Sequence, residues 1–183
     1  MRPWKHFFPD VMPLVPAVAE PMAEHHIRRA AQEFCRRTRA WRETLDAVIT
    51  RAGVRCYDLE LPPMVELVRL ESATLGCEPL ELDKTKPGTH IYTPDGKELI
   101  LSRGPGDGLQ LVVTCSLKPD NQSPGIEDAL FDLYTDEIAL GAVARLTSDE
   151  LKQEKFEAAC DRIKIHLWRG QAATQPRAVP NYF

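Results

Sequence analysis

Residues 54–118 lack the helical spacing of the segments on either side and instead contain short apolar runs bounded by turn residues. Glycine and proline pairs supply the reversals that antiparallel strands need, at Pro87-Gly88, Pro94-Asp95-Gly96 and Gly104–Gly108. The sequence therefore predicts an antiparallel β module between helices. Its expected strands are Val54–Leu61, Val65–Gly76, Pro79–Leu82, Thr89–Thr93, Lys97–Ser102 and Leu109–Leu117.

A first helix is predicted over about 21–52, because Pro21 suits a first helical position and Gly53 suits the residue after the end. One side of this helix is apolar, with Ile27, Ala30, Ala31, Phe34, Trp41, Leu45, Val48, Ile49 and Ala52. The opposite side is basic, with Arg28, Arg29, Arg36, Arg39 and Arg42.

Two further helices are predicted, over about 126–146 and 148–169. Thr147 and Glu150 form a capping-box pattern at the start of the later helix, and Gly170 suits its end. The outer face of the helix over 126–146 is acidic, with Glu127, Asp128, Asp132, Asp136 and Glu137. We interpret Asp128, Asp132, Asp136 and Glu137 as a possible acidic partner face for a neighbouring subunit.

Both ends of the chain are rich in proline. Residues 1–20 contain four prolines among apolar and aromatic residues and are expected to form an extended arm that packs along a surface. Residues 171–183 are expected to form an extended tail that binds a partner, through Pro176, Val179, Pro180, Asn181, Tyr182 and Phe183. A loose chain end is the alternative.

The expected architecture is α+β, a small antiparallel bundle of three main helices with an inserted antiparallel β module at about 54–118. A single domain over 21–170 carries the two arms. The length of 183 residues is sufficient for a core without disulfides or metal.

Bulk composition excludes several classes of function. The net charge of −4 gives no overall drive toward nucleic acid, and five cysteines without a CxxC pair suggest neither a disulfide framework nor a zinc site. No apolar run approaches the length of a membrane span, and Met1–Asp10 does not resemble a signal peptide. We expect a protein made in the cytoplasm, with no membrane contact.

No catalytic, cofactor-binding or metal-binding motif is visible, so an enzyme is not expected. His25 and His26 point about 100° apart on a helix and cannot share a metal as an i, i+4 pair would. Asp107 lies in a glycine run that we interpret as a turn. One alternative remains open, a small hydrolase that uses His90 or His166 with Cys115 or Cys160.

The basic side of the first helix allows two interpretations. Its arginines can form ion pairs at a subunit interface, or they can line a passage for DNA. Residues 22–52 contain seven arginines and four acidic residues, so the local surplus is modest and favours structural pairing. A DNA-binding module that uses this face is the alternative to a purely structural subunit.

Three stretches resemble a known family. They are Phe8-Pro9-Asp10-Val11 with Pro13 and Val15-Pro16, the run from Ala30 to Arg42, and Glu137–Leu146. They are similar to the corresponding parts of head-to-tail adaptor proteins of tailed bacteriophages, and the resemblance spans nearly the whole chain. Ser123-Pro124-Gly125 departs from the more regular entry to the second helix in that family.

The resemblance implies a virion protein of the neck, between head and tail. Its subunits would form a ring, typically a dodecamer, that binds the portal protein through the C-terminal tail and the tail or nozzle protein on the other side. Double-stranded DNA would pass through the channel without sequence recognition. Another neck or tail-completion subunit is the nearest alternative.

The small residues around Gly141 form a thin helix surface on which another helix can pack closely. We expect Phe34, Trp41 and Leu45 to fill it. A ring requires two different and complementary patches on each subunit, because only heterologous contacts propagate around a cycle. The basic and acidic helix faces are the candidates for these patches.

Overall fold

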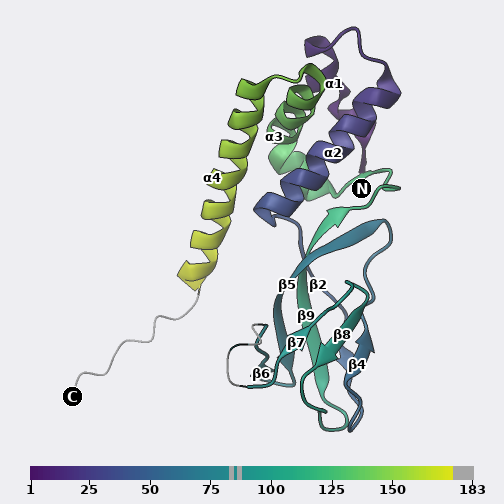
Figure 1. Cartoon of the computed structure of the whole chain (residues 1–183), viewed down its shortest axis with the longest axis vertical. Helices are drawn as coiled ribbons and strands as arrows, with labels where there is room; N and C mark the ends of the chain where they lie inside the picture. The colour runs from purple at the N-terminus through teal and green to yellow at the C-terminus, as the bar shows by residue number, and fades with distance from the viewer. Residues whose placement is uncertain (83–84, 86–87, 175–183) are drawn as a thin grey trace, which may run out of the picture.

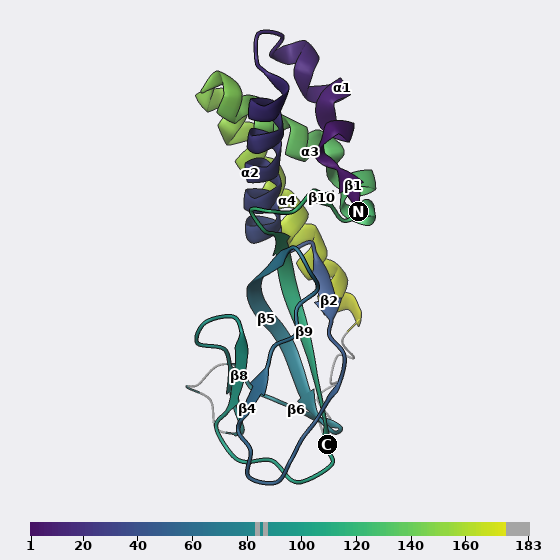
Figure 2. The same cartoon turned by 90° about the vertical axis from the view of Figure 1, so that its right-hand side faces the viewer.

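The computed structural model describes residues 1–82, 85 and 88–174 of the chain. Figure 1 shows an elongated molecule with the helices at one end and most of the strands at the other. The same division is visible after a 90° turn in Figure 2, where helix α2 leads toward the sheets. A single cluster of buried apolar residues extends through both parts.

The predicted N-terminal extended arm is wrong, because this segment folds into short helical turns: η1 (Trp4–Phe7), α1 (Phe8–Val11) and η2 (Met12–Leu14). Prolines permit these turns because Pro9 and Pro13 stand in the first turn of their helices, where no backbone N–H is needed.

The N-terminal turns are fixed by burial of their apolar side chains in the chain's own core. Trp4, Phe7 and Val11 are all at most 1% exposed, and Trp4 Nε1 donates a hydrogen bond of 2.7 Å to the Ser123 carbonyl. Strand β1 (Arg2–Pro3) pairs antiparallel with β10 (Gly125–Ile126). A Cβ at Gly125 would lie 2.0 Å from the Arg2 carbonyl oxygen, so only glycine fits there.

Helix α2 (Glu20–Thr38) ends fourteen residues before the predicted boundary at residue 52. Arg39 follows it in the left-handed region, with φ 55°, and its N–H donates to the Cys35 carbonyl. The rest of the predicted helix is not helical and contains two short strands, β2 (Arg42–Thr44) and β3 (Val48–Ile49). Both strands pair with β9, and this tertiary pairing overrides the helical spacing of the apolar residues.

The largest sheet is built on two long antiparallel strands, β5 (Val65–Leu75) and β9 (Gln110–Pro119). Their pairing runs from Val65 opposite Pro119 to Leu75 opposite Leu111, with two irregularities in register. The strand order is β2-β9-β5-β6, with β3 also on β9 and β6 at Glu78–Pro79. The other sheet of this region has the order β4-β8-β7, from Cys56–Asp58, Glu98–Leu101 and Ile91–Tyr92.

Helices α3 (Asp128–Thr147) and α4 (Glu150–Thr174) follow the strand β10. Helix α3 is kinked at Tyr134, where φ is −135° and ψ is 24°. It packs against α2 and α4. Helix α4 continues four residues beyond the end predicted at Gly170.

Gly141 on α3 lies directly against the Phe156 ring of α4. A Cβ at this position would lie 2.8 Å from two ring carbons of Phe156, which is fully buried. Phe156 of α4 therefore fills the thin helix surface, in place of the predicted Phe34, Trp41 and Leu45.

The predicted architecture, a small three-helix bundle with an inserted β module, is wrong. In the described part of the chain, an α+β fold combines four α-helices with three antiparallel sheets, and the sheets form a large share of the structure. Four strands lie outside the predicted insertion: β1, β2 and β3 before it, and β10 after it.

Candidate functional site

All five predicted arginines make contacts within their own chain, and for Arg28, Arg39 and Arg42 these contacts reach residues outside α2. Arg28 donates a 2.6 Å hydrogen bond to the Asn121 carbonyl and pairs with Glu24 at 3.4 Å. Arg42 Nε donates to the Arg39 carbonyl at 3.2 Å. Glu24 thus neutralises Arg28, whereas the described residues give Arg42 no ion pair and leave its Nη2 buried without a hydrogen-bond partner.

Arg39 is the most buried of the set, at 7% exposure. Its Nη1 pairs with Glu71 Oε2 at 3.2 Å, and its guanidinium lies 4.9 Å from the ring centre of Trp168. The side chain thus joins the end of α2 to β5 and α4, and its role is internal.

Arg29 and Arg36, the remaining two, lie on an exposed side of α2 and line a pocket of about 350 Å³. Gln32 and Glu33 lie between them on the same helix, and Lys118 of β9 and Arg145 of α3 complete the lining. Sequence reasoning missed Lys118 and Arg145. No local pattern could have found them, because three elements far apart in the chain bring these residues together.

The predicted acidic face is partly neutralised by the N-terminal segment. Arg2 lies 3.4 Å from Asp128 and 3.9 Å from Asp132. Within the described residues, no ion pair involves Asp136 or Glu137. The carboxylates available to a partner are therefore mainly those two, near the kink of α3.

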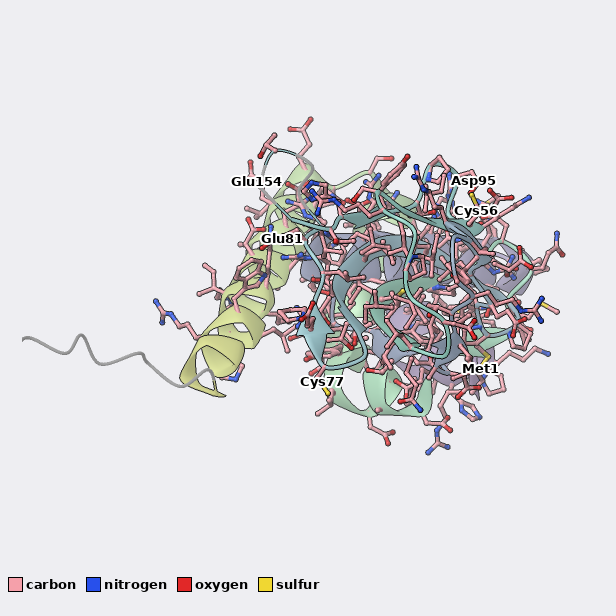
Figure 3. The ribbon with its side chains drawn as sticks, turned by 90° about the horizontal axis from the view of Figure 1, so that it is seen from below. Met1, Cys56, Cys77, Glu81, Asp95 and Glu154 are labelled. Atoms are coloured by element: carbon pink, nitrogen blue, oxygen red, sulfur yellow. The ribbon has the colours of Figure 1, made fainter. Side chains whose placement is uncertain are left out.

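The predicted tail site cannot be placed, because Pro176, Val179, Pro180, Asn181, Tyr182 and Phe183 lie outside the described residues. Helix α4 leads directly to this segment. Figures 1 and 3 show the second half of α4 projecting away from the rest of the fold.

A larger groove of about 790 Å³ lies beside two sheet edges, β2–β3 of the largest sheet and β4 of the three-stranded sheet. Its lining mixes apolar side chains with four carboxylates and one arginine, Arg51, so its charge suits a basic segment better than a phosphate. The apolar lining includes Leu45, Val48, Leu99, Leu111 and Val113, and the carboxylates are Glu43, Asp46, Asp58 and Glu60.

The cysteines proposed for a hydrolase are buried thiols. Burial, as the main cause, raises the pKa of Cys115 to about 11 and that of Cys160 to about 12. Among the described residues, no hydrogen bond joins either thiol to His90 or His166. At neutral pH both thiols are protonated, which is the unreactive form.

Residues 1–82, 85 and 88–174 contain no group of three or more histidine, cysteine or acidic side chains placed to hold a metal ion. No helix in the same residues combines the length and apolar character of a membrane span.

No protein-family model matches the chain, and no curated protein matches it.

Proposed function

We propose that the chain is a non-enzymatic structural subunit of a tailed bacteriophage, which assembles as the head-to-tail adaptor ring between portal and tail. The observation that carries this proposal is the exposed apolar surface of the second half of α4. The resemblance at residues 8–16, 30–42 and 137–146 supports it.

The exposed surface of α4 lies on the side away from its own core. Phe156, Ala159 and Cys160 are buried against the other helices. Ile165 follows Phe156 by nine residues, which places it about 180° around the helix from that ring. Ile165 is 51% exposed, so half of an isoleucine side chain faces solvent in the isolated subunit.

Trp168 adds to this surface. It is 52% exposed although its ring contacts Arg39. A large aromatic and an aliphatic side chain within one turn are typical of a helix that another protein covers. Partner proteins in a neck ring would remove this apolar area from water.

The subunit also carries two charged surfaces of opposite sign at different places. Asp136 lies near the middle of α3 and Arg145 lies in its last turn. The two residues are nine positions apart, which corresponds to roughly 14 Å along the helix axis. Heterologous contacts between neighbouring copies require two different patches of this kind. The pairing of the acidic and basic surfaces is a candidate contact, although most of the predicted arginines have partners within the chain.

The C-terminal residues 175–183 follow directly after the exposed helix. We propose that they bind the portal protein, that the ring surrounds the DNA exit channel in the neck of the virion, and that the tail or nozzle protein binds the other side. DNA passes through without sequence recognition.

Binding to the portal tests this proposal. The full chain, and a variant that ends at Thr174, are mixed with purified portal rings of the same phage and sedimented. The full chain should co-sediment with the portal, and the shortened chain should bind far less because it lacks the aromatic end. Circular dichroism checks that the shortened chain folds, which we expect because its buried core is intact. A full chain that never binds the portal would overturn the proposal.

A further inference from the structure

The pocket lined by Arg29, Arg36, Lys118 and Arg145 gathers four cations around a concavity of about 350 Å³. Glu33 is the single carboxylate in its lining, which leaves a formal excess of three positive charges. Cations converge in this way only at an electrostatic cost, and a bound anion would offset that cost.

Two of the four cations have no acidic partner. Arg36 forms an ion pair with Glu33, and Lys118 Nζ lies 2.7 Å from Glu66 Oε2. Arg29 donates only to the side-chain oxygen of Gln32, at 3.4 Å. Within the described residues, no ion pair involves Arg29 or Arg145.

The floor of the pocket is fixed by hydrogen bonds. Gln32 is 7% exposed, and its Nε2 donates to the Pro119 carbonyl and to Asn121 Oδ1, each at 3.1 Å. These bonds tie α2 to the end of β9 and to the loop after it, and the Gln32 oxygen accepts a hydrogen bond from Arg29. The pocket is therefore preorganised by the fold.

Arg145 provides an independent sign of a missing acceptor. Among the described residues its Nε is buried without a hydrogen-bond partner, as are Arg28 Nε and Arg42 Nη2 outside the pocket, although a buried donor normally has one. Its charge also contributes, after burial and His25, to the lowered pKa of His26. The positive potential therefore extends beyond the pocket itself.

We propose that Arg29, Arg36, Lys118 and Arg145 form a binding site for a phosphate group. Guanidinium groups bind phosphate oxygens through paired N–H donors, and Lys118 adds a point charge. Arg29 and Arg145 supply the uncompensated charge, and Arg36 and Lys118 can exchange their carboxylate partners for the ligand. The site itself is independent of the proposed function. The proposed function enters only where we identify the phosphate group as part of the DNA backbone inside the ring.

The test measures inorganic phosphate binding to the full chain by calorimetry at low ionic strength. The double variant Arg29→Gln with Arg145→Gln should bind phosphate about tenfold more weakly or worse, because it loses charge-assisted hydrogen bonds. The matched control is Arg55→Gln with Arg103→Gln, which removes the same charge from two exposed positions in the β region. The control should bind phosphate within about twofold of the unmodified chain, since neither residue lines the pocket.

A second arm uses a short DNA duplex over a range of salt concentrations. If DNA binding weakens with salt and is lost in the same double variant, the phosphate comes from the DNA backbone. If phosphate binds in the pocket and DNA does not, the natural ligand is a free phosphate or a small phosphorylated molecule. This result would still support the phosphate site.

Two results would overturn the proposal. One is the absence of saturable phosphate binding, or an equal loss in the double variant and the control, which would indicate general surface charge. The other is a double variant that fails to form rings on the portal while its phosphate binding is unchanged, which would show that the pocket receives carboxylates of another copy. Portal binding by the full chain is measured separately, so failure of the phosphate site is distinguishable from failure of the proposed function.

Discussion

Arg39 Nη1 lies 3.2 Å from Glu71 Oε2, and the two side chains are only 9% and 13% exposed. This ion pair connects the residue that ends α2 with the middle of β5. Because Arg39 also lies over the Trp168 ring, one guanidinium contacts both the largest sheet and α4.

Glu71→Gln should lower the free energy of unfolding by about 2 kcal/mol or more, because it leaves the Arg39 charge largely buried without its counterion. Urea denaturation measures the change. Glu66→Gln is the matched control, since Glu66 forms a more exposed pair with Lys118 and should cost under about 1 kcal/mol. Equal losses in the two variants would contradict the role assigned to Arg39.

Gly141→Ala should destabilise the chain by about 1–3 kcal/mol, although alanine is the better helix former. The reason is the buried ring of Phe156, which a Cβ would approach to 2.8 Å. Thermal unfolding measures the effect. Combining Gly141→Ala with Phe156→Leu should recover part of the loss relative to the sum of the single variants, and simple additivity would contradict the proposed clash.

The pKa of His26 is lowered below its usual value of 6.5 by burial first and then by His25 and Arg145. The unfolded chain therefore binds the His26 proton more readily than the folded chain. Its contribution to stability is fully present above pH 6.5 and is lost as the pH falls through the lowered pKa.

His26→Gln should therefore reduce the loss of stability between about pH 7 and pH 5, measured by urea denaturation at several pH values. His166→Gln, on an exposed side of α4, is the control and should keep the original pH dependence. A His26→Gln protein with unchanged pH dependence would refute this assignment.

The five cysteines should divide into two classes. Cys56 and Cys77 are exposed, and Figure 3 shows both at the surface of the β region. Cys35, Cys115 and Cys160 are buried, and burial raises the pKa of Cys35 to about 12. A thiol reagent at neutral pH should label two cysteines in the folded chain and all five after denaturation. Rapid labelling of Cys115 or Cys160 in the folded state would contradict this division and favour the hydrolase alternative.

Much of the local structure could be predicted from the sequence where the pattern is strong. Helix α3, at Asp128–Thr147, lies within two residues of the helix predicted at 126–146, because its apolar spacing continues through Ile138 and Ala142. The long strands β5 and β9 likewise lie close to the predicted strands, since turn residues bound them.

The end of α2 could not be predicted, because Trp41, Leu45 and Val48 have the spacing of a helix yet pack beside β9. The residue that ends the helix is Arg39, an arginine with a positive φ that its ion pair with Glu71 holds in place. This helix end depends on tertiary contacts. The sequence has no glycine there to mark it.

The candidate phosphate site could likewise be predicted only in part from the sequence. Arg29 and Arg36 stand out as part of a basic helix side, but Lys118 and Arg145 join them only through the packing of β9 and α3 on α2. The sequence also overestimates the basic face, since Arg28, Arg39 and Arg42 have partners in loops and strands that no helical pattern reveals.

Electron cryo-microscopy of the full chain bound to its portal would test the adaptor proposal most directly. We expect a closed ring of copies beneath the portal, with Ile165 and Trp168 of each copy covered by a neighbouring protein and residues 175–183 in contact with the portal. A portal that carries no such ring, or a ring in which this part of α4 stays uncovered, would contradict the proposal.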